Sequence, residues 1–68
     1  MTLYTRPDCS YSDAQRADLR AKGIAFTEVD LARQPERVPE VEQLTGGERI
    51  TPVMVEDGVV TVGFRGAG

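Results

Sequence analysis

The stretch VMVEDGVVTV, residues 53–62, carries the strongest local signal about the fold of this 68-residue chain. Two runs rich in valine flank Asp57-Gly58. An Asp-Gly pair favours the tight type I′ turn, because both of its central positions need a positive φ. Residues 53–62 therefore predict an antiparallel β-hairpin.

Two segments upstream of the hairpin predict further strands. TLYT, residues 2–5, is rich in β-forming residues and ends at Arg6-Pro7, where Pro7 and Asp8 favour a turn. IAFTEVD, residues 24–30, begins with apolar residues and then alternates. We expect this second strand to be buried on both faces in its first half.

Two helices are expected between these strands. The first runs from Ser10 or Ser12 to Lys22, with serine and aspartate suited to the N-cap and Gly23 to the C-cap. The second runs from Pro35 or Glu36 to Leu44 and is closed by Thr45-Gly46-Gly47. Because proline is tolerated only in the first turn of a helix, Pro39 favours a start nearer Val38.

In chain order these elements predict one α/β domain over residues 1–68 with the arrangement β-α-β-α-β-β. A right-handed crossover makes the first two strands parallel, and the hairpin adds an antiparallel pair. The expected sheet is therefore four-stranded and mixed.

The composition excludes several classes of function. A single cysteine rules out an intramolecular disulfide, and the absence of histidine rules out Cys-His and Ser-His-Asp catalysis within the chain. A net charge of −3 argues against nucleic acid as a partner. We find no clustered metal ligands and no apolar run that suggests a signal peptide or a membrane span, so we expect a cytoplasmic protein in a reducing compartment.

Cys9 is the candidate for chemistry. It lies between the turn at Pro7 and the start of the first predicted helix, where free N–H groups and the helix dipole favour a thiolate. Arg6 can add positive charge, whereas Asp8 and Asp13 oppose it. A lowered thiol pKa would make Cys9 a better leaving group from a mixed disulfide. The alternative is a small buried apolar residue without chemistry.

Two stretches resemble glutaredoxins. YTRPDCSYS, residues 4–12, is similar to their active-site stretch, which commonly reads Y-[ST]-[KR]-x-x-C-P-Y-C, and ITPVMVEDGVVTVGF, residues 50–64, is similar to their later segment with a cis-proline. The resemblance covers nearly the whole chain and implies a thioredoxin-like fold in which Cys9 faces a cis Thr51-Pro52 bond. The family continues into a last helix beyond the position of Gly68, so we expect that helix to be short or absent.

The resemblance also implies roles for individual residues. Cys9 is the nucleophile, and Ser12, which stands where a second cysteine would resolve a mixed disulfide, can at most hydrogen-bond the thiolate. The second thiol must then come from solution, which is a monothiol mechanism. Tyr11 either borders the substrate groove or is simply an exposed aromatic residue. The implied substrate-binding residues are Arg6, Tyr11, Thr51, Pro52 and Gly63.

The implied function is a thiol–disulfide oxidoreductase that reduces disulfide-containing or glutathionylated proteins. Its reductant would be glutathione or a thioredoxin-type reductase. Gly63 matches the family's Gly-Gly-x-Asp-Asp signature, but Phe64-Arg65 follows it and the acidic pair is missing. This form is closer to the glutaredoxin-like proteins that use thioredoxin-type reductants.

Two other functions stay open. In one, Cys9 and glutathione from each of two chains bridge a [2Fe–2S] cluster; in the other, the domain is a redox-inactive scaffold for protein contacts. Without a last helix we also expect strand residues of one sheet face to be partly bare and to favour a homodimer. These residues are Val53, Val55, Val60 and Val62.

Overall fold

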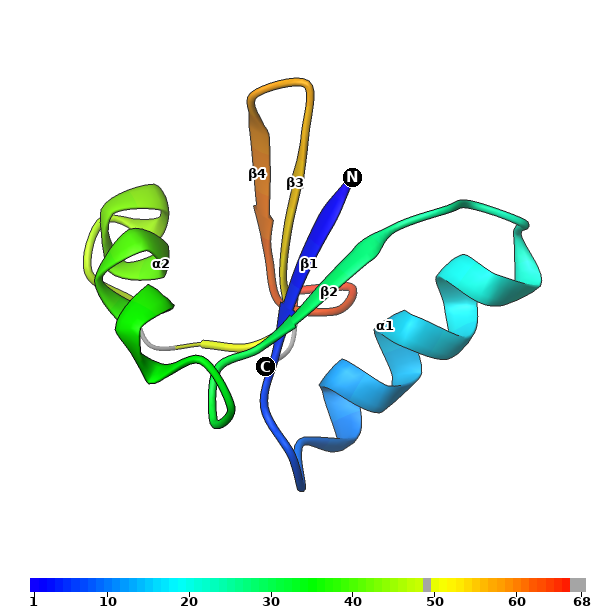
Figure 1. Cartoon of the computed structure of the whole chain (residues 1–68). Coiled ribbons are helices and arrows are strands. Elements are labelled where there is room, and N and C mark those ends of the chain that lie inside the picture. Colours follow the sequence, from blue (N-terminus) through cyan, green and yellow to red (C-terminus); the bar gives the residue numbers. More distant parts are fainter. Residues whose placement is uncertain (49, 67–68) are drawn as a thin grey trace.

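The computed structural model describes residues 1–48 and 50–66; Arg49, Ala67 and Gly68 lie outside the description. Its strands join in the order β2-β1-β3-β4, with β1 parallel to β2 and antiparallel to β3, and β3 antiparallel to β4. The predicted β-α-β-α-β-β arrangement with a mixed sheet is therefore confirmed (Figure 1). The elements are β1 (Thr2–Thr5), α1 (Ser10–Ala21), β2 (Thr27–Asp30), the 3₁₀ turn η1 (Pro35–Arg37), α2 (Val38–Thr45), β3 (Val53–Glu56) and β4 (Val59–Val62).

The hairpin forms as its turn residues predict. Asp57 and Gly58 both have positive φ, 51° and 79°, and join β3 to β4. Across the hairpin Val53 pairs with Val62 and Val55 with Val60. The Asp-Gly pair thus sets the register that places these four valines on one face of the sheet.

The second strand is shorter than expected. It begins at Thr27, whose N–H donates to the Met1 carbonyl at 2.9 Å, whereas residues 24–26 are not in a strand. Ile24 and Ala25 are exposed, so the expectation of a first half buried on both faces is wrong. The reason is pairing: β1 begins at Thr2, which lies opposite Thr27, and leaves residues 24–26 without a partner strand.

Helix ends follow the expectations with small shifts. The N-cap of α1 is Cys9 rather than a serine or aspartate, and its C-cap is Lys22, with Gly23 next at a φ of 70°. The second helix begins at Val38, as Pro39 favours, and runs to Thr45 before a left-handed Gly46.

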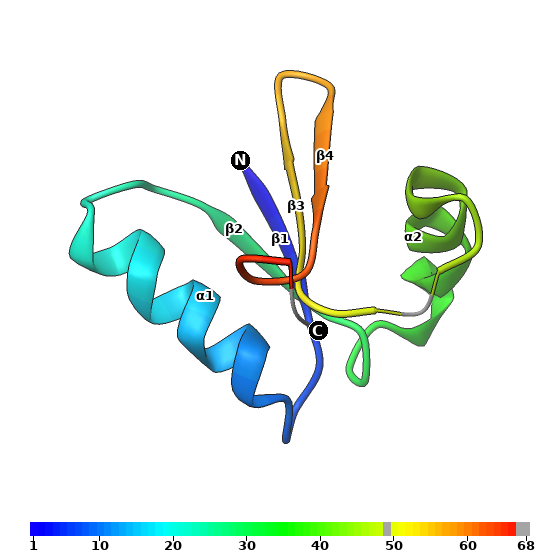
Figure 2. The ribbon, with the colours of Figure 1, turned by 180° about the vertical axis from the view of Figure 1, so that it is seen from behind.

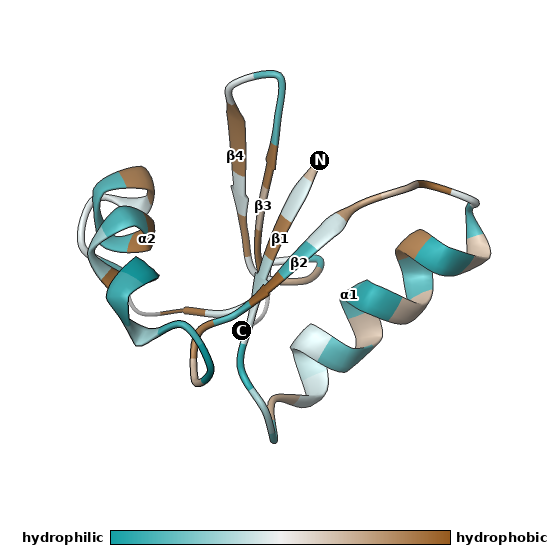
Figure 3. Cartoon of the chain, in the orientation of Figure 1, coloured by the Kyte–Doolittle hydropathy of each residue, from teal (hydrophilic) through white to brown (hydrophobic). Residues whose placement is uncertain are grey.

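The two helices lie on opposite sides of the sheet in both ribbon views (Figures 1 and 2). The apolar core cluster lies on the α2 side. Figure 3 shows apolar colour on the strands and on one side of α2, whereas α1 is mostly hydrophilic. The buried members of the cluster are Tyr4, Val29, Leu31, Val41 and Val53, with Val38, Val55 and Val60 packed against it.

The expectation that four hairpin valines would be partly bare is wrong for Val53, whereas Val55, Val60 and Val62 are half-buried. Val53 is fully buried, and Val55 and Val60 pack against the cluster, because strand alternation points them toward the side covered by α2. Val62 is half-buried. The exposed apolar residue of the hairpin is instead Val59, on the opposite face.

Polar contacts attach α1 to the sheet. The Arg16 guanidinium donates to both carboxylate oxygens of Glu28 in β2, each at 2.7 Å, and the Thr5 hydroxyl donates to Glu28 at 2.8 Å. The buried residues of α1 are Ser12, Gln15 and Leu19. Only one of these is apolar, so the Arg16–Glu28 ion pair replaces part of the usual hydrophobic contact. No helix among the described residues is long and apolar enough to cross a membrane.

Candidate active site

Cys9 sits at the junction between the loop after β1 and the start of α1. Asp8, just before it, has a φ of 58°, a conformation that aspartate tolerates in turns. The Cys9 carbonyl accepts the Asp13 N–H at 3.1 Å, which begins the helix. The Cys9 side chain therefore lies at the positive end of the α1 dipole and is partly accessible.

A cis peptide bond between Thr51 and Pro52 stands opposite Cys9, as the resemblance implied. The Thr51 hydroxyl donates to Cys9 Sγ at 3.3 Å, and the Cys9 thiol donates to the Thr51 carbonyl at 3.7 Å. Behind this loop the Gly63 N–H donates to the Pro52 carbonyl at 2.7 Å, and Gly63 has a φ of 81°. Gly63 thus holds the cis-proline loop against the end of β4.

Ser12 lies one turn into α1 and is 0% exposed. Its hydroxyl has no hydrogen-bond partner of normal geometry, although it is near enough to the sulfur to affect the acidity of Cys9. A buried hydroxyl without a partner is uncommon and costs about 1–3 kcal/mol. A thiolate at Cys9 would supply the missing acceptor.

The pKa of Cys9 is lowered from its ordinary value. Burial is the largest single influence and raises the pKa, because it disfavours the charged thiolate. Hydrogen bonds oppose it and together outweigh it: first from the Ser12 hydroxyl, then from the Thr51 hydroxyl, then from the backbone N–H groups of Ser12 and Tyr11. The acidity of Cys9 therefore depends on two neutral hydroxyl groups and the helix N-terminus.

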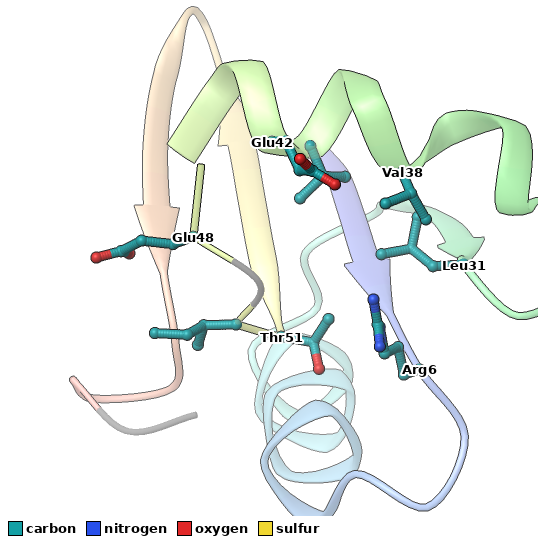
Figure 4. A pocket seen from close by; sticks show the side chains of 8 residues that line it. Arg6, Leu31, Val38, Glu42, Glu48 and Thr51 are labelled. Atoms are coloured by element: carbon teal, nitrogen blue, oxygen red, sulfur yellow. The ribbon is translucent and has the colours of Figure 1, made fainter. Parts of the chain in front are cut away.

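A small pocket lies beside the cis-proline loop, with a volume of about 10 Å³, which is room for about one water molecule (Figure 4). Figure 4 shows α2 on one side of it and Thr51 on the other, with the Arg6 guanidinium turned toward Leu31. Sequence reasoning missed most of its lining, because these residues meet only when α2 folds over the loop. The lining residues are Arg6, Leu31, Val38, Val41, Glu42, Glu48, Ile50 and Thr51.

Arg37 and Tyr4 both hydrogen-bond Glu40 of α2. The Arg37 guanidinium lies 5.7 Å from the centre of the Tyr4 ring and donates to Glu40 at 2.8 Å. The Tyr4 hydroxyl also hydrogen-bonds Glu40. Arg37 is therefore held by α2 itself and is less free to bind an anionic ligand.

The structure separates the candidate residues into three groups. Cys9, Ser12 and Thr51 come together around the sulfur, while Pro52 and Gly63 shape the loop opposite it. Arg6 lines the pocket, whereas Tyr11 is 43% exposed on the first turn of α1 and does not line it. Within residues 1–48 and 50–66 no three metal-binding side chains cluster.

Comparisons with known proteins find similar sequences and a similar fold. The glutaredoxin family model matches residues 1–60. Two curated relatives, each called glutaredoxin-like protein NrdH, come from Lactococcus lactis strains MG1363 and IL1403; each is 32% identical over 65 residues, 96% of this chain and 88% of the relative. A solved structure, described as the basis for the thioredoxin-like activity profile of the glutaredoxin-like protein NrdH-redoxin from Escherichia coli, is 30% identical, with a TM-score of 0.83 over 94% of this chain and 82% of that one.

Proposed function

Because this chain belongs to the glutaredoxin family, we propose that it is a thiol–disulfide oxidoreductase that acts through Cys9 alone. The observation that carries the proposal is the placement of Cys9 at the N-cap of α1, with a lowered pKa and the cis Thr51–Pro52 loop opposite. A thiolate there is both an available nucleophile and a good leaving group.

The proposed reaction has three exchanges. The Cys9 thiolate attacks one sulfur of a substrate disulfide, forms a mixed disulfide and releases the other sulfur as a thiolate. A first thiol of the electron donor then attacks the substrate sulfur of the mixed disulfide and releases the Cys9 thiolate. A second donor thiol displaces the substrate as a thiolate, so the substrate is reduced and the donor is left as a disulfide. Ser12 cannot perform this second step, so the reaction is monothiol.

We propose a thioredoxin-type reductase, rather than glutathione, as the preferred electron donor. The Arg37 guanidinium already pairs with Glu40 and lies over the Tyr4 ring. The sequence after Gly63 reads Phe64-Arg65-Gly66-Ala67, so the acidic pair of the family signature is absent. The Escherichia coli relative is described as having a thioredoxin-like activity profile. Substrates would be disulfide-containing or glutathionylated proteins of a reducing, cytoplasmic compartment.

A mass spectrum taken after treatment with oxidised glutathione tests the thiol chemistry, with Cys9→Ser as the control. We expect one glutathionyl adduct on the wild-type chain and none on the variant, and an unmodified wild-type chain would contradict the proposal. Turnover of a disulfide substrate is then followed with NADPH and thioredoxin reductase, or with glutathione and glutathione reductase. We expect faster turnover with the first system, and the reverse order would overturn our choice of donor.

The cluster-carrier function makes a different prediction for the same chain. Expression under anaerobic conditions with glutathione would then yield a brown protein with visible absorbance that Cys9→Ser abolishes. If the protein binds such a cluster and shows no disulfide turnover, the oxidoreductase proposal is wrong and the cluster-carrier function is supported.

A further inference from the structure

Strand β4 forms one edge of the sheet, because β3 is its only neighbouring strand among the described residues (Figure 1). In an antiparallel pair, the backbone N–H and C=O groups of successive residues point alternately toward the partner strand and away from it. The Gly63 N–H donates to the carbonyl of Pro52, just before β3, and so points toward β3. By this alternation Thr61 also faces β3, whereas the N–H and C=O groups of Val60 and Val62 point outward.

These outward groups have no hydrogen-bond partner within the part of the chain that the structure describes. No loop, turn or helix hydrogen bond there uses the backbone of Val60 or Val62. A sheet edge of this kind pairs readily with another strand unless charge, proline or a covering segment prevents it.

The two edges of the sheet differ in this respect. Strand β2, at the opposite edge, carries Glu28 and Asp30 among its four residues, and such charges oppose the addition of a further strand. Strand β4 reads Val-Val-Thr-Val, so it has neither charge nor proline and is β-branched throughout. The sequence therefore protects the β2 edge and leaves the β4 edge open.

One symmetric register uses every outward group of β4. When two copies of β4 lie antiparallel with their Thr61 residues opposite each other, Val60 of each copy lies opposite Val62 of the other. Each of these valine pairs then exchanges both of its N–H···O=C bonds. The Val60 and Val62 side chains are half-buried on the α2 face, so the pairing also covers their remaining apolar surface with valines of the other copy.

We propose that β4 is an interaction surface for a second copy of this chain, which adds its own β4 antiparallel and continues the sheet across both copies. The same four residues complement themselves, because a two-fold axis through the Thr61 pair matches every outward donor with an outward acceptor. The uncharged edge also lets two chains of net charge −3 meet without a carboxylate in the strand pair. Cys9 takes no part in this pairing, so the proposal is independent of the oxidoreductase function.

Four residues from each copy make a small interface, so we expect weak association that depends on concentration. Sedimentation of the full chain under a reducing agent, which prevents a disulfide between copies, covers about 10 μM to about 1 mM protein. The mean mass should rise from the 7.4 kDa of one chain toward twice that value. A mass that stays at one chain at the highest concentration would overturn the proposal.

Amide hydrogen exchange over the same concentrations identifies the surface. The Val60 and Val62 N–H groups should exchange severalfold more slowly at high concentration, whereas the Thr61 N–H, which faces β3, should be protected throughout. Protection of Val60 and Val62 that does not depend on concentration would mean that another segment covers the edge, and it would overturn the proposal.

Two charge variants test the register. Thr61 is exposed, and in the proposed register its side chain lies directly opposite the other copy's Thr61. Thr61→Lys and Thr61→Glu should each lose association, because like charges meet, and an equal mixture of the two should regain it. Thr27→Lys, at an exposed position on β2, is the matched control and should associate like the wild type.

Two outcomes of this mixing experiment would show that the register is wrong. In one, the single Thr61 variants associate as well as the wild type; in the other, the mixture stays monomeric. Val59→Ala separates edge pairing from association through the exposed sheet face, and it should leave the edge dimer nearly unchanged. Association that is lost in Val59→Ala but kept in Thr61→Lys would place the contact on that face and overturn the proposal.

Discussion

Ser12 combines complete burial with a hydroxyl that has no regular partner in the described structure. In a purely structural position this hydroxyl would be a liability, because an unmade buried hydrogen bond costs stability. Beside Cys9 it has a use, since it is the strongest of the hydrogen-bond influences that lower the thiol pKa. Ser12 stands where family members often carry a second cysteine, and here its hydroxyl lowers the pKa of Cys9.

We expect Ser12→Ala to raise the pKa of Cys9 without lowering stability when the thiol is protonated. The variant loses a donor to the thiolate and also loses an unsatisfied buried hydroxyl. Alkylation rates across pH measure the first effect, and urea unfolding at about pH 6 measures the second. Ser10→Ala, at an exposed position on the same helix, is the matched control.

The pH dependence of stability is a second, independent test of Ser12→Ala. Because the folded-state pKa of Cys9 is lowered, its contribution to stability is present above the unfolded thiol pKa of about 8.5 and is lost as the pH falls through the folded value. Wild type should therefore gain more stability than Ser12→Ala between about pH 6 and pH 9. Equal gains in the two proteins would contradict this account of Ser12.

At the scale of elements, α1 contacts the sheet through an ion pair between Arg16 and Glu28 and buries only one apolar side chain, Leu19. Arg16 and Glu28 have side chains that are 23% and 29% exposed, and Glu28 also accepts the Thr5 hydroxyl. The hydrogen bond from Arg16 is the largest influence that lowers the pKa of Glu28. The helix that presents Cys9 is therefore positioned on β2 by an ion pair as well as by Leu19.

We expect Glu28→Gln to lower the free energy of unfolding at neutral pH by about 1–2 kcal/mol, because it removes a charge-assisted hydrogen-bond network. The lowered pKa of Glu28 stabilises the fold above the unfolded value of about 4.3, and this contribution is lost as the pH falls through the folded value. Urea unfolding from pH 7 down to pH 3 should therefore show the variant approaching the wild type in acid.

The control for this prediction is Glu56→Gln, which makes the same change at an exposed position at the end of β3. It should leave stability nearly unchanged. A Glu28→Gln variant that stays less stable by the same amount at every pH would show that side-chain shape, rather than charge, matters at this position.

At the scale of the whole molecule, α2 decides which face of the hairpin is covered. Val53 is 0% exposed beneath it, whereas Val59, on the other face of the same hairpin, is 65% exposed. Half-buried Met54 shares that face, beside a hollow of about 300 Å³ that Met1 also lines. The most exposed apolar side chain of the hairpin therefore lies opposite the face expected from the sequence.

Val53→Ala and Val59→Ala test this assignment with the same substitution in one hairpin. We expect the first to cost about 2 kcal/mol, because it removes two buried methyl groups and leaves a cavity, and the second to cost less than about 0.5 kcal/mol. Urea unfolding measures both. Similar losses in the two variants would mean that Val53 is not covered as described.

The same unfolding experiments at two protein concentrations address self-association, which stays a prediction. A midpoint that rises with concentration in the wild type, and rises less in Val59→Ala, would indicate a homodimer through the exposed face. A midpoint independent of concentration would contradict it.

Local features of the sequence determined the order of elements and the position of the thiol. Asp57-Gly58 places the hairpin, Pro39 places the start of α2, and the Pro7-Asp8 turn puts Cys9 at a helix N-terminus. These features were readable because each acts over a few residues, through φ preferences, missing donors and caps that hold in any tertiary setting.

Tertiary structure alone decided what surrounds the sulfur and which face is covered. The first residue of β2 is set by where β1 begins, because the two strands must pair. The burial of Val53 depends on which face of the sheet α2 packs against. The hydroxyl of Thr51 reaches Cys9 across 42 residues of chain, and no local pattern encodes that contact. The sequence could locate the candidate thiol and the nearby Ser12, but only the fold could bring the Thr51 hydroxyl to the sulfur.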